Sequence, residues 1–380
     1  MNIGIVIPCY NRVDSLNRLL VSLEGANYIG EEVDLIFSID YSGINNIRYL
    51  AESFQWEFGS KKIILHPSNI GLKQNILSCG DLVDEYDAVI VLEDDLYVAK
   101  DFYNYAKQAA YYYLNNDNIA GISLFSYKYT EIGFYQFYPF QDNYDTFFIQ
   151  WPSSWGQLWT KRQWHSFRSW LSLNKSLEDI NIPASVKLWT HSWKKFYIAY
   201  MIDLDKYFVY PYVSFTNDFG SSGVHHTNQS NICTTSLFFG INKKYLFRDF
   251  DKSSIYVYDC FFQMRKRNLI LNDREYDVCF DLYSTKDVCN IDTNYVITSK
   301  TIKKPIISFA SIHIPFEYNI LTNEGGGFFY LTTKNEYKKQ SLAILKKETL
   351  RMKMYVPDMI KYVCYKIWRK IFKESYSNEY

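Results

Sequence analysis

Short apolar runs and amphipathic segments alternate along the first 115 residues of the chain. Runs with the length and composition of buried strands stand at 3–7, where Pro8 is expected to end the strand, and at 33–39, 62–65 and 88–92. Apolar side chains at helical spacing predict helices over 14–23, 47–54, 71–82 and 102–114. Strands that alternate with helices form parallel sheets covered on both faces. The predicted fold class is therefore α/β, with a mostly parallel, doubly wound sheet.

The pattern changes beyond residue 115. An aromatic and irregular stretch runs from 127 to 150, and a tryptophan-rich segment follows it. Within 240–340, β-type runs stand at 276–282, 295–299 and 305–312. We expect a main domain over 1–235, with halves at 1–115 and 116–235, and a smaller strand-rich accessory region over 236–345.

The last segment, 346–380, is basic and amphipathic. One helical face carries Ile360, Val363, Ile367 and Ile371, and lysines and arginines flank it. This pattern is typical of an interfacial helix on an anionic membrane. It is equally typical of a C-terminal helix that packs on its domain and turns a basic face to solvent.

Composition excludes several classes of protein. The 41 Lys and Arg balance the 41 Asp and Glu, so no net charge favours a nucleic-acid partner. The seven cysteines are scattered without a CxxC pair, which indicates a reducing compartment and no zinc or disulfide framework. No signal-peptide pattern opens the chain, and no apolar run has the length of a membrane span. We therefore expect a cytoplasmic protein. The 19% of aromatic residues fits a carbohydrate enzyme and equally a chain with Tyr- and Phe-heavy cores.

Three acidic residues, Glu93, Asp94 and Asp95, stand directly after the strand at 88–92. Ligands of open α/β sheets bind outside the carboxyl ends of the strands. Clustered carboxylates repel one another unless a cation joins them, and Mg²⁺ and Mn²⁺ favour carboxylate and phosphate oxygens. The cluster therefore predicts a site for a metal ion and a diphosphate. The alternative is a structural role, in which Asp95 or Asp101 caps the helix that begins near 102.

These acids belong to a set of motifs that resembles the GT-A class of nucleotide-sugar glycosyltransferases. The set comprises Pro8-Cys9-Tyr10-Asn11-Arg12, Ser38-Ile39-Asp40, Glu93-Asp94-Asp95 and several Trp, Gly and His segments, all within about residues 1–230. The motifs are most similar to those of bacterial polysaccharide glycosyltransferases. The segment 93–102 also resembles the metal-site segment of animal N-acetylglucosaminyltransferase I. The resemblance implies a nucleotide-sugar half at 1–115 and an acceptor half at 116–235.

The resemblance also implies roles for residues of the donor half. Arg12 and Asp40 would contact the uracil or ribose of a UDP-sugar, in a site that Pro8 and Tyr10 help to form. Asp95 would be the direct ligand of Mn²⁺ or Mg²⁺. Glu93 and Asp94 would hold the ribose, the sugar and water molecules. Lys73 is expected to reach a phosphate, although a solvated lysine at the start of a helix fits the pattern as well.

On the acceptor side, the resemblance implies that Trp151, Ser154 and Trp155 belong to an acceptor loop. Gly223 and His225 would lie near the diphosphate, where His225 would bind metal or phosphate or stand as a surface imidazole. Core packing is the preferred interpretation for Trp159 and Trp164.

The general base is the weakest part of the resemblance. An inverting transferase needs a base that deprotonates the acceptor hydroxyl. Lys194 and Lys195 stand where the animal enzyme has an aspartate, and a charged lysine is a poor base. The candidates are His191, Asp218 and Asp179, with Glu178 beside them. We favour His191, because the unperturbed pKa of histidine lies near neutrality.

The sequence thus predicts a metal-dependent, inverting glycosyltransferase of bacterial surface-polysaccharide synthesis. Its acceptor would be a saccharide or lipid-linked oligosaccharide, met at the inner face of the cytoplasmic membrane. One alternative is a degenerate sugar- or nucleotide-binding module without turnover, which the missing aspartate favours. A nucleotidyltransferase is a second alternative, but its glycine-rich basic loop has no counterpart in 8–12.

Overall fold

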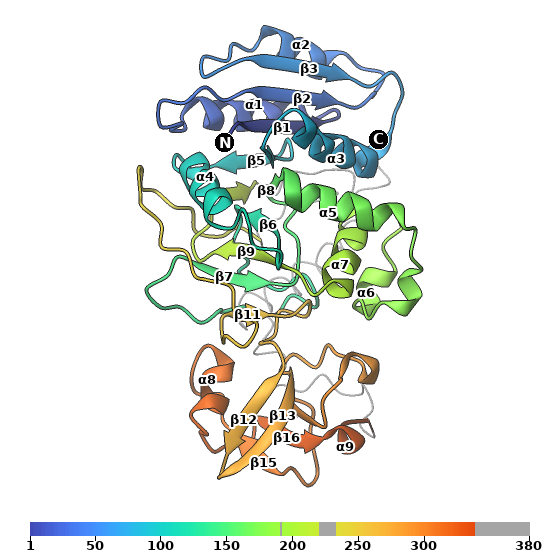
Figure 1. Cartoon of the computed structure of the whole chain (residues 1–380), viewed down its shortest axis with the longest axis vertical. Helices are drawn as coiled ribbons and strands as arrows, with labels where there is room; N and C mark the ends of the chain where they lie inside the picture. Colours follow the sequence, from blue (N-terminus) through green and yellow to red (C-terminus); the bar gives the residue numbers. More distant parts are fainter. Residues whose placement is uncertain (191, 220–232, 339–380) are drawn as a thin grey trace, which may run out of the picture. The chain divides into compact units, whose positions relative to one another are not determined.

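The computed structural model describes residues 1–190, 192–219 and 233–338 (Figure 1). The chain forms two compact units. Unit 1 comprises Met1–Lys128 and Pro139–Arg265, and unit 2 comprises Tyr129–Tyr138 and the chain from Lys266. Residues 236–265, assigned to the accessory region from the sequence, therefore belong to unit 1. The predicted tail, 346–380, lies outside the described residues.

The first half of unit 1 shows the predicted alternation of strands and helices. Strands β1 (Ile3–Cys9), β2 (Leu35–Ile39), β3 (Lys61–Leu65) and β4 (Ala88–Val91) are parallel, in the order β4-β1-β2-β3. The helices are α1 (Val13–Glu24), α2 (Asn46–Ser53), α3 (Gly71–Asp81), which the short 3-10 helix η1 (Leu82–Asp84) follows, and α4 (Phe102–Tyr112). Apolar periodicity alone was sufficient to predict these elements.

The second half of unit 1 extends this sheet to nine strands, in the order β11-β7-β9-β6-β8-β4-β1-β2-β3. Its strands are β6 (Ile119–Ser123), β7 (Thr146–Ile149), β8 (Gln157–Thr160), β9 (Tyr207–Pro211) and β11 (Val257–Tyr258). Within the described part of this nine-stranded sheet, only the pairs β4–β8, β6–β8 and β7–β9 are antiparallel, so the mostly parallel sheet is confirmed. The expectation of irregular structure over 127–150 was wrong for β7, a short aromatic run without strand-like alternation.

Helices cover both faces of the sheet, as a doubly wound fold requires (Figure 1). On one face, Ile3, Ile5 and Ile7 of β1 share a core with the leucines of α1 and with α2 and α4. The other face carries α3, α5 (Lys161–Ser172) and α7 (Trp193–Asp203), while η2 (Leu177–Asp179) and α6 (Ala184–Lys187) connect α5 to α7. There, Trp159 and Trp164 are fully buried with their rings 4.6 Å apart, which confirms their role in core packing.

A glycine sets the close approach of α3 and α5. A Cβ atom on Gly80 would lie 2.2 Å from Cζ2 of Trp164, which is shorter than any van der Waals contact. Glycine at this position therefore lets the indole lie flat against α3.

Unit 2 contains a five-stranded sheet in the order β12-β13-β14-β16-β15. Its elements are β12 (Arg267–Leu271), β13 (Arg274–Asp281), η3 (Val288–Asn290), β14 (Tyr295–Thr298), β15 (Ile307–Phe309), α8 (Phe316–Leu321), β16 (Phe329–Thr333) and α9 (Lys334–Lys338). The strands predicted at 276–282, 295–299 and 305–312 correspond to β13, β14 and β15. A separate strand-rich region near the C-terminus is thus confirmed.

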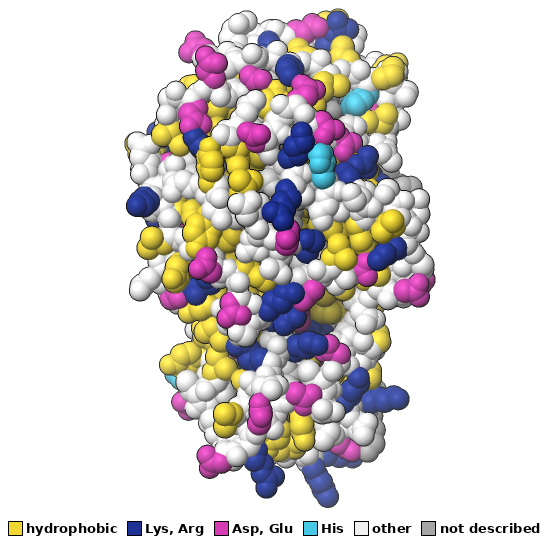
Figure 2. All heavy atoms as spheres, in the orientation of Figure 1, with side chains coloured by type: hydrophobic (Ala, Val, Ile, Leu, Met, Phe, Trp, Pro, Cys, Tyr) yellow, Lys and Arg dark blue, Asp and Glu magenta, His cyan; other side chains and the backbone are white. Residues whose placement is uncertain are grey.

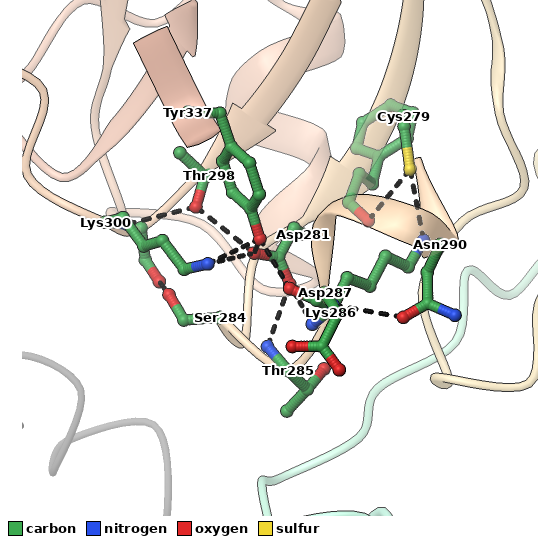
Figure 3. Close-up of polar contacts among 12 residues, drawn as sticks. Cys279, Asp281, Ser284, Thr285, Lys286, Asp287, Asn290, Thr298, Lys300 and Tyr337 are labelled. Atoms are coloured by element: carbon green, nitrogen blue, oxygen red, sulfur yellow. Dashed lines mark hydrogen bonds and ion pairs between the residues drawn. The ribbon is translucent and has the colours of Figure 1, made fainter. Parts of the chain in front are cut away.

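A buried polar cluster lies at the carboxyl end of β13 in unit 2 (Figure 3). Oδ1 of Asp281 accepts hydrogen bonds from the backbone N–H groups of Thr285 (2.8 Å) and Lys286 (3.0 Å). Its Oδ2 accepts from the hydroxyls of Tyr337 (2.7 Å) and Thr298 (3.4 Å). We call these residues the Asp281 cluster; both carboxylate oxygens are satisfied within it.

Two further expectations concern membranes and cysteines. In the described parts of the chain, no helix has the length and hydropathy needed to cross a bilayer. Cys9 and Cys79 are buried thiols, and Cys289 is an exposed thiol.

Candidate active site

The acidic motif lies at the point where the strand order of the sheet reverses. Strand β1 has β2 on one side and β4 on the other. From β1 the chain therefore first adds β2 and β3 on one side and then returns to add β4 on the opposite side. The loop after β1 carries Arg12, and the loop after β4 carries Glu93, Asp94 and Asp95. Both loops therefore flank the crevice in which open α/β sheets bind their ligands.

Pro8 helps to shape this crevice. Strand β1 continues through Pro8 to Cys9, so the expectation that Pro8 ends the strand was wrong. Odd-numbered residues of β1 bond to β2, as in the contact from Asp40 N–H to Cys9 O, whereas Val6 bonds to Leu92 on the β4 side. Pro8 thus turns its missing N–H toward the region beyond the end of β4, where no ladder bond is lost.

A guanidinium fork joins two of the acids. Nη1 of Arg12 lies 2.5 Å from Oδ2 of Asp95, and Nη2 donates to Oδ1 of Asp94. The backbone N–H of Tyr10 also donates to the Asp94 carboxylate. Arg12, Asp94 and Asp95, with the neighbouring Glu93, are called the acid cluster below. The arrangement lets one cation span two strand ends of the crevice.

The single positive charge of Arg12 does not balance the three carboxyl groups of the acid cluster. Burial, reinforced by the negative charge of Asp95, raises the pKa of Glu93 to about 8. Burial likewise raises the pKa of Asp94 to about 6, against the opposing influence of Arg12. Like charges that are taken out of water raise one another's pKa unless further cations join them. The cluster therefore favours an additional positive charge.

One oxygen of the acid cluster identifies where such a charge fits. Oδ1 of Asp95 is buried and has no hydrogen-bond partner among the described residues. Within the same residues, no three His, Cys, Asp or Glu side chains converge as a metal cage. Mg²⁺ sites that serve phosphates commonly use one or two carboxylates, and the substrate supplies the other oxygens. A single ligand from Asp95 fits that kind of site.

Asp40 lies at the same edge, directly after β2, and is almost fully buried. Its Oδ1 accepts from the N–H groups of Tyr41 (2.9 Å) and Ile70 (2.8 Å). Its Oδ2 accepts from the N–H of Gly71 (2.9 Å), which has a positive φ of 77°. Asp40 therefore fixes the start of α3 against β2, and a contact with the nucleotide stays a prediction.

Lys73, on the first turn of α3, is held by an aromatic ring. Its Nζ lies 3.7 Å from the ring centroid of Phe196 on α7, and burial lowers the pKa of this lysine. The ring face attracts the ammonium group and holds it at the start of α3. The contact also brings α7 to the wall of the site.

The acceptor loop divides into buried and partly exposed residues. Trp151 is fully buried, with its ring 5.4 Å from that of Phe262, so its place is in the core. Ser154 and Trp155 are partly exposed, and the Trp155 ring lies 4.6 Å from that of Phe125. Because Gln157 pairs with Val91, the residues before it run toward the acid cluster. Substrate contact by Trp155 and Ser154 stays a prediction.

The candidates for the general base have different surroundings. Strand β10 (Thr216–Asp218) pairs with β5 (Leu96–Val98), which places Asp218 opposite Leu96, the residue that follows Asp95. Asp179 is exposed at the end of η2, and Glu178 lies 3.5 Å from Lys187. His191, Gly223 and His225 lie outside the described residues.

Sequence reasoning missed the position of Lys194 at the start of α7. Its side chain is buried, its Nζ lies 3.3 Å from the Tyr127 hydroxyl, and it is 5.4 Å from the Trp151 ring centroid. Its positive charge opposes the upward shift in the pKa of Glu93. The available signal was a pair of lysines, Lys194 and Lys195, at the start of a helix whose next seven residues are aromatic or apolar.

No family model matches this chain, and no curated protein sequence matches it. The solved structures that resemble it include S. aureus TarS 1–349 in complex with UDP-GlcNAc, at 14% identity over 60% of this chain and 61% of that one, with a TM-score of 0.38. GalNAc-T7 with UDP, GalNAc and Mn²⁺ matches at 12% identity over 56% of this chain and 42% of that one, with a TM-score of 0.39.

The mannosyltransferase PcManGT from Pyrobaculum calidifontis, in complex with GDP-Man and Mn²⁺, matches at 15% identity over 32% of this chain and 34% of that one, with a TM-score of 0.25. This chain thus spans less than two thirds of the length of each of these structures.

Proposed function

We propose that this chain is a glycosyltransferase that takes its sugar from a nucleotide-sugar donor. The observation that carries the proposal is the acid cluster at the β1/β4 switch point, where Arg12 spans Asp94 and Asp95 and Oδ1 of Asp95 has no partner among the described residues. Switch-point crevices bind nucleotides, and the leaving group of such a donor is a diphosphate. The motif resemblance within 1–230 supports glycosyl transfer over other nucleotide chemistry.

The donor half would bind a UDP-sugar along the carboxyl edge of the sheet. The resemblance assigns Arg12 to the uracil or ribose, but its position between Asp94 and Asp95 favours an interaction with the diphosphate once the guanidinium is freed from the carboxylates. Lys73 would supply a second cation from α3. Asp95 is the residue to hold Mn²⁺ or Mg²⁺, which when bound would neutralise the leaving diphosphate. Asp40 positions the loop that closes the nucleoside end of the site.

The acceptor half would bind a saccharide whose hydroxyl attacks the anomeric carbon with inversion. That hydroxyl must lose its proton to a base within hydrogen-bond reach. Among the described candidates, Asp218 is supported by its place beside Asp95, whereas Asp179 is supported only by the motif resemblance. Trp155, at the partly exposed end of the acceptor loop, offers an apolar ring face to a sugar.

The biological setting follows from the motif resemblance and the basic tail. Bacterial surface polysaccharides are assembled on lipid-linked oligosaccharides, which fits an acceptor at a membrane surface. We propose that the enzyme acts in the cytoplasm, with 346–380 in peripheral contact with anionic lipid.

Donor hydrolysis tests the function directly. Full-length protein is incubated with UDP-, GDP- and dTDP-sugars, with and without Mn²⁺, and release of nucleoside diphosphate is measured. We expect release from a UDP-sugar that requires the metal ion. Tight binding of the donor without release of nucleoside diphosphate or transfer of the sugar would favour the degenerate binding module. This module is the second candidate because Lys194 stands where the animal enzyme has an aspartate. Formation of nucleotide-sugar from nucleoside triphosphate and sugar phosphate would indicate a nucleotidyltransferase.

A further inference from the structure

A histidine that the motifs do not include lies at the nucleoside end of the crevice. His66 directly follows β3, and its backbone N–H donates to the carbonyl of Ile39, the last residue of β2 (3.0 Å). It is therefore next to Asp40 at the carboxyl edge of the sheet. The side chain is partly exposed, and its Nε2 lies 3.1 Å from Oγ of Ser38.

The surroundings of Ser38 decide which ring nitrogen of His66 carries the proton. Nδ2 of Asn75 donates to the Ser38 carbonyl (3.1 Å), and this contact fixes the orientation of the amide. Oδ1 of Asn75 therefore faces Oγ of Ser38 at 2.6 Å. Two oxygens at that separation share a proton, and only the serine hydroxyl can supply it.

The proton of Ser38 is thus committed to Asn75, so Ser38 can only accept from His66. Neutral His66 then carries its proton on Nε2 and a lone pair on Nδ1. Nδ1 has no partner among the described residues, and its partial exposure leaves it accessible to a ligand. The network prepares a hydrogen-bond acceptor at the edge of the sheet.

The position of this acceptor matches one end of a nucleotide whose other end is at the acid cluster. Neighbouring strands are about 4.8 Å apart, so the end of β3 lies roughly 14 Å across the sheet edge from that of β4. Asp40, between the two, already accepts three backbone N–H groups.

We propose that Nδ1 of His66 accepts a hydrogen bond from the ring N–H of the donor's base. This inference rests on the proposed function and specifies its substrate class. Uracil, thymine and guanine carry such an N–H next to a carbonyl, whereas cytosine and adenine present a bare ring nitrogen at the equivalent place. His66 is therefore a residue that selects uridine-type donors and rejects cytidine and adenosine nucleotides.

The test compares UDP with N3-methyl-UDP, which lacks the ring N–H. Two variants separate the nitrogens of the imidazole. His66→Gln keeps an N–H that reaches Ser38 but has no acceptor at the Nδ1 position. His66→Asn places a carbonyl oxygen near the Nδ1 position and gives up the contact with Ser38. Binding is measured by calorimetry with Mn²⁺ present, and melting of the ligand-free proteins shows that each variant is folded.

We expect His66→Gln to bind UDP roughly tenfold more weakly than wild type, with unchanged affinity for N3-methyl-UDP. His66→Asn should keep most of the preference for UDP. Equal losses for both ligands, or wild-type UDP binding by His66→Gln, would overturn the assignment of His66 while the transferase proposal stands. If the wild type binds none of UDP, GDP and dTDP, both the inference and the proposed function fail.

Discussion

Two buried carboxylate sites of this protein differ in whether both oxygens of the carboxylate have hydrogen-bond partners. Asp281 in unit 2 is fully buried, and both of its oxygens accept hydrogen bonds from the chain (Figure 3). Asp95 in unit 1 shares Arg12 with Asp94, yet its Oδ1 is buried without a partner among the described residues. Buried polar groups are nearly always satisfied, so an exception needs an explanation. Both oxygens of Asp281 are thus satisfied by the chain, whereas one oxygen of Asp95 is left for the metal ion that we propose.

The surfaces show why net charge could not reveal this difference. Figure 2 shows basic and acidic side chains interspersed over the visible face, with hydrophobic side chains exposed between them. The functional contrast lies in how individual oxygens are satisfied inside the protein.

The largest effect is expected from opening the complete cluster. Asp281→Ala removes the acceptor for the backbone N–H groups of Thr285 and Lys286 and for the Thr298 hydroxyl. It also removes the carboxylate that lies 3.8 Å from Nζ of Lys300, which keeps its hydrogen bond to the Tyr337 hydroxyl. Each buried donor left unsatisfied costs about 1–3 kcal/mol, so we expect a loss of at least about 3 kcal/mol in the free energy of unfolding of unit 2. Urea denaturation measures it.

The control for that experiment is Asp292→Ala, which removes an exposed carboxylate of unit 2 that pairs only with Lys266. We expect it to change the free energy of unfolding by less than about 1 kcal/mol. If Asp281→Ala is as stable as this control, the Asp281 cluster has no structural role.

The second effect breaks the incomplete cluster. Asp95→Asn keeps the shape of the side chain and removes the charged ligand, so we expect a loss of roughly 100-fold or more in Mn²⁺-dependent turnover. Melting of the ligand-free protein should hardly change, because Asp95 satisfies few groups of the folded chain. Asp84→Asn, at an exposed carboxylate beside His165, is the matched control. Full activity of Asp95→Asn would remove the basis for the metal assignment.

The third effect should have opposite signs for two ligands. In the folded chain Arg12 occupies the place of a cation between Asp94 and Asp95. Arg12→Gln should therefore bind Mn²⁺ alone several-fold more tightly than wild type, because the carboxylates lose their internal partner. The same variant should bind UDP with Mn²⁺ more weakly, because the diphosphate loses a guanidinium. Manganese titration followed by electron paramagnetic resonance measures the first, and calorimetry the second. A change of the same sign for both ligands would contradict competition between Arg12 and the metal ion.

These contrasts mark where sequence reasoning succeeded and where it stopped. Local periodicity was sufficient for β1 to β4 and for α1 to α4, and it placed the acid cluster at a strand end because the motif directly follows β4. It could not show that Asp218 lies beside Asp95, since that depends on the β5–β10 pairing between segments more than 100 residues apart. Nor could it show that three backbone N–H groups donate to the Asp40 carboxylate, or that Asn75, through Ser38, determines which ring nitrogen of His66 carries the proton. Such roles depend on partners that carry no signal of their own.

The last effect concerns pH and Glu93, the third acid of the acid cluster. The pKa of Glu93 rises from 4.5 to about 8 on folding. A carboxyl group with a raised pKa stabilises the folded state below its unfolded pKa, and this contribution is lost as the pH rises toward the folded value. The ligand-free wild type should therefore lose melting temperature between pH 5 and pH 8 relative to Glu93→Gln, which stays neutral throughout. Glu85→Gln, at an exposed carboxylate paired with Lys62, should follow the wild type over the same range.

Melting curves at four pH values provide the comparison, and parallel curves for wild type and Glu93→Gln would show that Glu93 ionises normally. Because Mn²⁺ bound at Asp95 would favour the charged form of Glu93, added metal should narrow the gap between the two proteins at pH 8.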